Sequence, residues 1–262
     1  MQSWSQTEIE QAILKLASDP LAIKWMKNPP RPVQLVAVTN NWKAIQFIRY
    51  PETDLQLFAI EKDPKNAYKM IRNIHPDALV KSCALYGMNL QNFRNPTKAM
   101  IFAAVGNDGN AIQFVKQQTT ELQMLALRSA PMSFCFFKHP TKTVRKIALE
   151  RYPENIQHIS NPTVAEQLYA MNKNHHLIRS IRRPCPEAMV IAIANDPSYY
   201  LKIKNPPEAA SIEYVKHGPS NISRVKSPSR SVKWSAIMNQ PKSIDFINDP
   251  TPEMIATAII CG

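Results

Sequence analysis

A small residue recurs along the chain at a nearly constant interval. Starting at Ala37, the intervals are 22, 25 and 20 residues and then 22 residues throughout, with Tyr214 replacing alanine in one repeat. Self-similarity at a fixed period is the signature of stacked structural repeats. The column comprises Ala37, Ala59, Ala84, Ala104, Ala126, Ala148, Ala170, Ala192, Tyr214, Ala236 and Ala258.

Two columns of proline accompany the small residue. One proline stands five positions after it in most repeats, as at Pro131, and another stands fourteen positions after it, as at Pro140. Proline is tolerated in the first turn of a helix and disfavoured in its interior, so the columns predict two short helices per repeat. Hydroxyl side chains that follow the second proline column are placed to cap the first helix. They are Thr97, Thr119, Thr141, Thr163, Ser229 and Thr251.

The second helix carries apolar residues at the eighth and eleventh positions, as in Ile45 with Ile48 and Ile112 with Val115. Residues three apart share one helical face, which we expect to be core. Helices this short are not stable alone and need stacked neighbours. The pattern predicts an all-α α-solenoid of about ten 22-residue helical hairpins over residues 29–262, as one continuous domain, with an N-terminal capping hairpin at residues 1–28.

Two segments resemble known repeats: LVAVTNNWKAIQFIRYP at residues 35–51 and FAAVGNDGNAIQFVKQ at residues 102–117. They are similar to the short two-helix repeats of uncharacterised bacterial and phage proteins and, more distantly, to HEAT-like α-solenoids. The resemblance covers nearly the whole chain and concerns structural positions. It therefore implies a fold and no catalytic or binding residue.

Composition argues against an enzyme. The chain has 262 residues, 44% of them hydrophobic, so it can bury a core, but its 5 glycines cannot build the usual phosphate-cradling loops. Nucleotide-binding and hydrolase motifs are absent, and the four cysteines form no C-x-x-C pair. Four of the histidines, His139, His158, His175 and His176, occupy different repeat positions. We expect no catalytic residue, no metal site, no cofactor and no small-molecule ligand.

The charge balance favours a polyanionic partner. Lys and Arg number 32 against 20 Asp and Glu, which gives a net charge of +12. No apolar run reaches the roughly 18 residues that span a membrane, and no cationic leader precedes the first apolar residues. We expect a cytoplasmic protein that does not enter a membrane.

The twelfth position after the small residue is basic in six repeats, at Arg49, Lys116, Lys138, Arg182, Lys204 and Lys226. Arg72 and Arg94 fall close by, where the spacing slips. Equivalent positions line up along a solenoid, so the column predicts a basic ridge. The alternative is that the twelfth position lies in the last turn of the second helix, where the helix dipole stabilises a cation without any ligand.

The residues at the tenth position favour the interpretation as a basic ridge over stabilisation by the helix dipole. It holds phenylalanine at Phe47, Phe114, Phe136 and Phe246, but His158, Ser180, Lys202 and Arg224 in the repeats between residues 148 and 226. The helix dipole does not explain this second change. The candidate phosphate-binding residues are Arg49, Lys116, Lys138, Arg179, Arg182, Arg183, Lys202, Lys204, Arg224, Lys226, Arg230 and Lys233.

The aromatic residues lie beside the predicted core. We interpret Trp25, Trp42, Trp234 and the phenylalanines of the tenth position as packing residues rather than as platforms for bases. Taken together, the pattern predicts a non-enzymatic protein that binds nucleic acid, RNA or DNA, mainly through backbone phosphates. The alternative is a protein-interaction scaffold, or a phage-encoded inhibitor, that uses the same ridge to bind an acidic host-protein surface.

Overall fold

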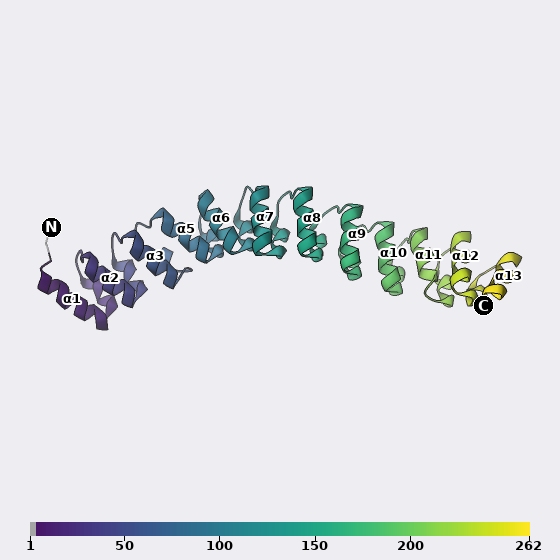
Figure 1. Ribbon diagram of the computed structural model, residues 1–262, viewed down its shortest axis with the longest axis horizontal. Helices are drawn as coiled ribbons and strands as arrows, with labels where there is room; N and C mark the ends of the chain where they lie inside the picture. The colour runs from purple at the N-terminus through teal and green to yellow at the C-terminus, as the bar shows by residue number, and fades with distance from the viewer. Residues whose placement is uncertain (1–3) are drawn as a thin grey trace. The chain divides into compact units, whose positions relative to one another are not determined.

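The structure, a computed structural model, describes residues 4–262, and within them every regular element is helical and no strand occurs (Figure 1). The α-helices are α1 (Gln6–Ser18), α2 (Arg31–Asn40), α3 (Thr53–Lys62), α4 (Ala67–Met70), α5 (Pro76–Leu85), α6 (Lys98–Asn107), α7 (Thr120–Ser129), α8 (Lys142–Arg151), α9 (Val164–Lys173), α10 (Pro186–Asn195), α11 (Glu208–Val215), α12 (Arg230–Asn239) and α13 (Pro252–Cys261). The 3-10 helices are η1 (Pro20–Trp25), η2 (Trp42–Phe47), η3 (Gly87–Asn92), η4 (Gly109–Phe114), η5 (Pro131–Phe136), η6 (Pro153–His158), η7 (His175–Ser180), η8 (Pro197–Lys202), η9 (Pro219–Arg224) and η10 (Pro241–Phe246).

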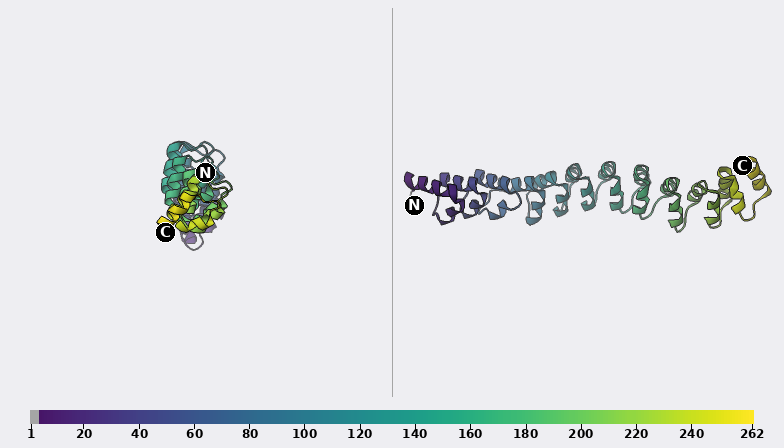
Figure 2. Two further views of the ribbon diagram at one scale, coloured as in Figure 1. Left: turned by 90° about the vertical axis from the view of Figure 1, so that its right-hand side faces the viewer. Right: turned by 90° about the horizontal axis from the view of Figure 1, so that it is seen from below.

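The chain divides into two compact units, Met1–Val144 and Arg145–Gly262. In the first unit, α1 packs on α2, α5 on α6 and α6 on α7, while η1 packs on η2, η3 on η4 and η4 on η5. The α-helices of this unit therefore form one layer and the 3-10 helices another (Figure 2, right). In the second unit, each helix from α9 to α13 packs on the next, and η6 packs on η7 and η9 on η10. Both units thus stack hairpins in chain order, as the predicted all-α repeat fold requires.

Most hairpins follow one backbone plan, which residues 31–52 illustrate. Helix α2 is followed by Asn41, an extended residue with φ −149° and ψ 106° whose N–H donates to the carbonyl of Ala37 at 2.9 Å. Helix η2 is followed in the same way by the extended residue Ile48, whose N–H donates to the carbonyl of Ile45 at 3.1 Å. An extended residue cannot continue either helix, so the hairpin has a ten-residue α-helix and a six-residue 3-10 helix. The prediction of two short helices is confirmed, and the second one is a 3-10 helix.

The predicted capping residues are confirmed in all six hairpins. Each hydroxyl is the N-cap or stands directly before its α-helix, and accepts from the N–H three residues on, as Thr119 does from Leu122 at 3.2 Å. Thr163 adds a reciprocal bond, because Glu166 accepts from the Thr163 N–H at 2.7 Å. Such a cap stabilises a helix by about 1 kcal/mol. The same interactions are made by Thr97, Thr141, Ser229 and Thr251.

The small-residue column is buried. We number repeat positions from the residue whose carbonyl accepts from the N–H that ends the α-helix, which we call position zero. Ala126, Ala148, Ala170 and Ala192 are equivalent under this definition and have no exposed surface. Position eleven is also buried, at Ile48, Val115, Ile159, Ile181, Val225 and Ile247. Position eight is buried at Ile45, Ile112, Ile156 and Ile222 and only partly covered at Ile178 and Ile244.

The prediction is wrong for one residue of the small-residue column. Ala84 is exposed, and position zero of that hairpin is Ser82, which is fully buried and accepts from the Tyr86 N–H at 3.0 Å. The intervals around it are therefore 23 and 22 residues, so the chain contains a single inserted residue. The insertion lies in the turn before α4, where the Ala67 N–H donates to the Asp63 carbonyl four residues back. This bond makes α4 an α-helical turn where the other hairpins have a 3-10 helix.

Tyr214 is accommodated by a local change of backbone. Helix α11 is two residues shorter than its neighbours, and its cap Lys216 keeps helical angles instead of turning extended. The Tyr214 ring is buried and stacks on Tyr200, with ring centres 4.1 Å apart and planes 5° apart. Tyr200 in turn shares a hydrogen bond of 2.9 Å with Ser211. A stacked tyrosine pair thus replaces the alanine and isoleucine of other hairpins.

Candidate nucleic-acid interface

The candidate interface runs along the loops that leave the second helices. We define the loop strip as positions nine to thirteen of each hairpin. It comprises residues 24–28, 46–50, 69–73, 91–95, 113–117, 135–139, 157–161, 179–183, 201–205, 223–227 and 245–249. The strip contains no aspartate or glutamate until the last hairpin, where Asp245 and Asp249 appear. From residue 24 to residue 227 its formal charge is therefore positive or neutral in every repeat.

The corrected register extends the basic column at position twelve. With Ser82 at position zero, Arg94 falls at position twelve, and the inserted residue brings Arg72 there as well. The hairpin of α1 and η1 has the same spacing and adds Lys27. From sequence, Arg72 and Arg94 fall only close to the column because Ala84 and the inserted residue obscure the register, and Lys27 is absent from the column because residues 1–28 are assigned to a cap. We define the basic column as Lys27, Arg49, Arg72, Arg94, Lys116, Lys138, Arg182, Lys204 and Lys226.

All nine side chains of the basic column are exposed. Within residues 4–262, none of them has a carboxylate oxygen within 4.0 Å. Lys138 makes one contact through its ammonium group, at 3.4 Å from the Val115 carbonyl. The charges of the column are therefore not neutralised by the acidic residues of the described chain.

The main chain at position twelve is held by hydrogen bonds to side chains in three of the hairpins. The carbonyl of Lys27 accepts from Trp4 Nε1 at 3.3 Å, and that of Arg49 accepts from Asn73 Nδ2 at 2.9 Å. At Lys138 the N–H donates to Gln118 at 2.8 Å, and the carbonyl accepts from Gln123 at 3.0 Å. These hydrogen bonds order the loops and keep the side chains directed outwards at a fixed place.

The structure corrects the expected helical setting of this column. Position twelve does not lie in the last turn of the second helix, because that helix ends at position ten and position eleven is extended, as at Ile203 with φ −89° and ψ 120°. The helix dipole acts within the last turn, so it stabilises a cation at position ten more than one at position twelve. On either side of the partly buried Ile203 at position eleven, Lys202 at position ten and Lys204 at position twelve are both exposed.

In the second unit, cations also gather around Tyr199. The Arg179 guanidinium carbon and the Lys202 ammonium nitrogen each lie 5.1 Å from the centre of its ring. The Tyr199 hydroxyl lies 2.8 Å from His176 Nδ1, and its ring is buried. The structure thus brings Arg179 and Lys202 of neighbouring hairpins to one ring, which anchors both charges at the strip.

The other predicted residues are placed less uniformly. Arg183 and Arg224 are exposed in the strip. Arg230 begins α12, outside the strip, 4.0 Å from the Glu253 carboxylate. Lys233 is partly buried on α12 and donates to the Asn248 carbonyl at 3.3 Å. Arg49, Lys116 and Lys138 belong to the first unit, and all three are exposed there.

The packing interpretation of the aromatic residues holds for several of them and is wrong for Trp25. Trp42, Phe114 and Phe136 are partly buried against the core. Trp25, at position ten of the first hairpin, is 78% exposed. Phe47 follows it at the same position of the next hairpin and is 37% exposed.

Within residues 4–262, no group of three or more His, Cys, Asp or Glu side chains is arranged to hold a metal ion. None of the described helices combines the length and the apolar character needed to cross a bilayer. Comparisons with family models, with curated proteins and with solved structures find no match to this chain. The resemblance to HEAT-like repeats therefore stays a prediction.

Proposed function

We propose that the protein binds nucleic acid, RNA or DNA, through its backbone phosphates and without catalysing a reaction. The observation that carries the proposal is the basic column: nine of the eleven hairpins with a loop strip place an exposed cation at one loop position. Those cations have no carboxylate partner among the described residues, and the helix dipole explains them poorly.

The spacing of the charges supports a polyanionic partner. Helices that pack together lie ~8–10 Å apart, so cations on adjacent hairpins sit about one Debye length from each other at physiological salt. Such a row repels itself, and an acidic side chain at the strip would relieve the repulsion, yet the first ten hairpins have none there. A chain of phosphates relieves it and also gains the free energy of counterion release.

Salt dependence tests the proposal. Lys204→Ala combined with Lys226→Ala removes two charges of the basic column in the second unit. We expect a lower affinity for unrelated sequences and a decrease of about one to two units in the slope of log K against log salt, because each lost phosphate contact contributes ~0.7–0.9. The measurement is fluorescence anisotropy with labelled single-stranded RNA and DNA at several salt concentrations.

A matched control removes the same charge elsewhere in the second unit. Lys146→Ala combined with Lys173→Ala changes two exposed lysines on α8 and α9, outside the strip, and should leave the slope unchanged. The proposal is wrong if both double variants bind like the wild type. If the wild-type protein binds no nucleic acid even at low salt, a scaffold that binds an acidic protein surface becomes the better hypothesis.

A further inference from the structure

We propose that unpaired bases of a single strand stack on an aromatic platform in the first two hairpins. We define the aromatic platform as Trp25, Phe47 and Tyr50. This inference rests on the proposed function and deepens it, because it names single-stranded nucleic acid as the ligand class. Sequence reasoning alone treats Trp25 and Phe47 as packing residues.

The three rings are exposed to different extents. Trp25 is 78% exposed, Tyr50 66% and Phe47 37%. Fully burying an aromatic side chain is favourable by ~1.5–3 kcal/mol. Exposed rings on adjacent hairpins therefore do not contribute this free energy to folding. Trp42, in the second hairpin, is packed against the core and shows that a tryptophan can be accommodated there. Clustered exposed rings are typical of a binding surface rather than of scattered apolar residues.

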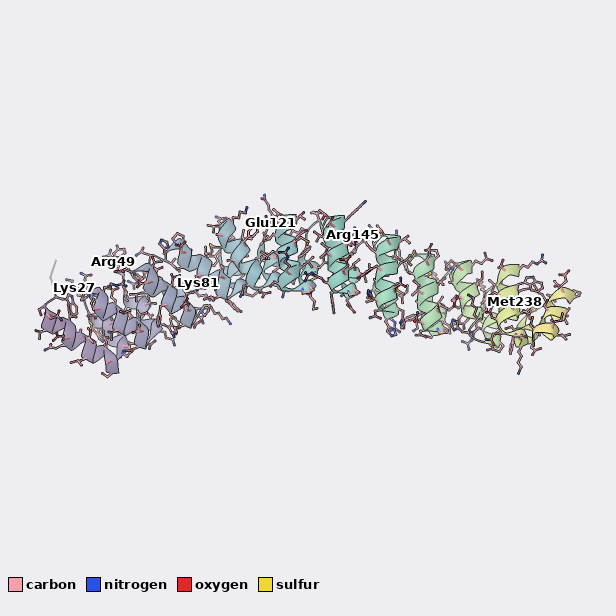
Figure 3. The ribbon with its side chains drawn as sticks, viewed as in Figure 1. Lys27, Arg49, Lys81, Glu121, Arg145 and Met238 are labelled. Atoms are coloured by element: carbon pink, nitrogen blue, oxygen red, sulfur yellow. The ribbon has the colours of Figure 1, made fainter. Side chains whose placement is uncertain are left out.

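The fold places the platform residues side by side along the strip. Helices η1 and η2 pack against each other, and Trp25 and Phe47 are their last residues, at the same position of the two hairpins. Tyr50 stands at position thirteen of the second hairpin. Lys27 and Arg49, the cations of the same two loops, project from one edge of the molecule (Figure 3).

Cations surround these rings. The Lys24 ammonium nitrogen lies 4.9 Å from the centre of the Trp25 ring, and the Arg49 guanidinium carbon lies 5.2 Å from the centre of the Tyr50 ring. The nearby carboxylates are already engaged, since Arg31 forms ion pairs with Glu52 and Asp54. The strip of these two hairpins contains no acidic residue.

Rings interleaved with cations match the chemistry of a single strand. Aromatic side chains stack on base faces without regard to sequence, while Lys and Arg follow the phosphates. In a duplex the base faces are covered by neighbouring base pairs, so a platform of this kind gains nothing from double-stranded DNA. An acidic peptide would satisfy the cations and leave the rings exposed.

The test separates bases from phosphates with two probes: a short labelled oligothymidine and a strand of the same length that carries abasic sites throughout. We expect the wild-type protein to bind the oligothymidine more tightly. Trp25→Leu should weaken oligothymidine binding by about 5- to 150-fold, the range for loss of one stacked base, and change abasic binding by less than twofold. Tyr50→Ala should act in the same direction, and Tyr50→Phe, which keeps the ring, should restore binding.

Leu14→Ala is the matched control, because Leu14 belongs to the first hairpin, is 74% exposed and lies on α1 rather than in the strip. It should bind both probes like the wild type. The inference is overturned if Trp25→Leu and Tyr50→Ala bind oligothymidine like the wild type. If the wild type binds both probes equally and the Lys204 and Lys226 variant weakens both, the phosphate proposal stands and the platform fails. If neither probe binds, both proposals fail.

Discussion

The loop strips of the two units differ in their side chains but share one backbone. In the first unit, position ten holds aromatic or uncharged residues, such as Trp25 and Phe136, beside a cation at position twelve. In the second unit, position ten itself becomes cationic at Lys202 and Arg224. The 3-10 helix has six residues and ends in an extended residue in both cases. The backbone is thus set by the buried positions, which leaves position ten free to vary.

The largest expected effect tests whether the buried positions set this backbone. Tyr214→Ala removes a buried ring from the stack with Tyr200 in the second unit, and should lower the free energy of unfolding by about 3–5 kcal/mol. Ala170→Leu makes the opposite volume change at the same repeat position, and should cost ~1–3 kcal/mol through overpacking. Urea unfolding followed by circular dichroism measures both. An unchanged midpoint for either variant would contradict the role we assign to position zero.

A smaller effect on stability is expected when one glycine from each unit is replaced by alanine. A Cβ at Gly109 would lie 2.3 Å from the Ala126 carbonyl oxygen, so Gly109→Ala must shift the next hairpin and should cost about 1–3 kcal/mol. At Gly218 a Cβ meets nothing closer than 3.6 Å, and φ is 173°, which any residue adopts. Gly218→Ala should therefore stay within about 0.5 kcal/mol of the wild type. Equal melting temperatures for the two variants would show that the hairpins of the first unit are not held this closely.

The smallest expected effect on stability comes from exchanging the residue types of position ten between the two units. Phe136 is partly buried against the first unit's core, so Phe136→Lys should cost about 1 kcal/mol of lost burial. Lys202 is exposed, and Lys202→Phe should change stability by less than about 0.5 kcal/mol. Thermal unfolding of both proteins checks the difference. A loss of several kcal/mol in Lys202→Phe would mean that position ten is not free to vary in the second unit.

The fold could be predicted from sequence because its signals are local. Proline and hydroxyl residues mark helix starts chemically, and caps such as Thr119 and Thr163 are seen where they were expected. The register around Ser82 could not be read, because serine and alanine are both small and the chance alanine at position 84 kept the column unbroken. A six-residue second helix can be α or 3-10 on propensity alone, so its type and its end at position ten needed the structure.

The candidate site was predicted only in part. Charge placement was enough to select Lys204 and Lys226, because exposed cations need no packing context. The missed column members Arg72 and Arg94 followed from the register error. The exposure of Trp25 was not predictable, since an aromatic residue beside a core stripe has the same sequence pattern whether its ring turns inwards or outwards.

The contacts between hairpins join residues that are close in sequence, and this affects the rate of folding. Among hydrogen bonds involving side chains of the described residues, the widest separation in sequence is the 25 residues between Asn89 and Pro64. Chains dominated by such local contacts close only small loops on the way to the native state, and they fold in microseconds to milliseconds rather than seconds. Folding of a stacked array of this kind can start at any hairpin and spread to its neighbours. Each hairpin is thus a possible nucleus, and a hairpin altered by an inserted residue, as before α4, leaves the others able to start folding.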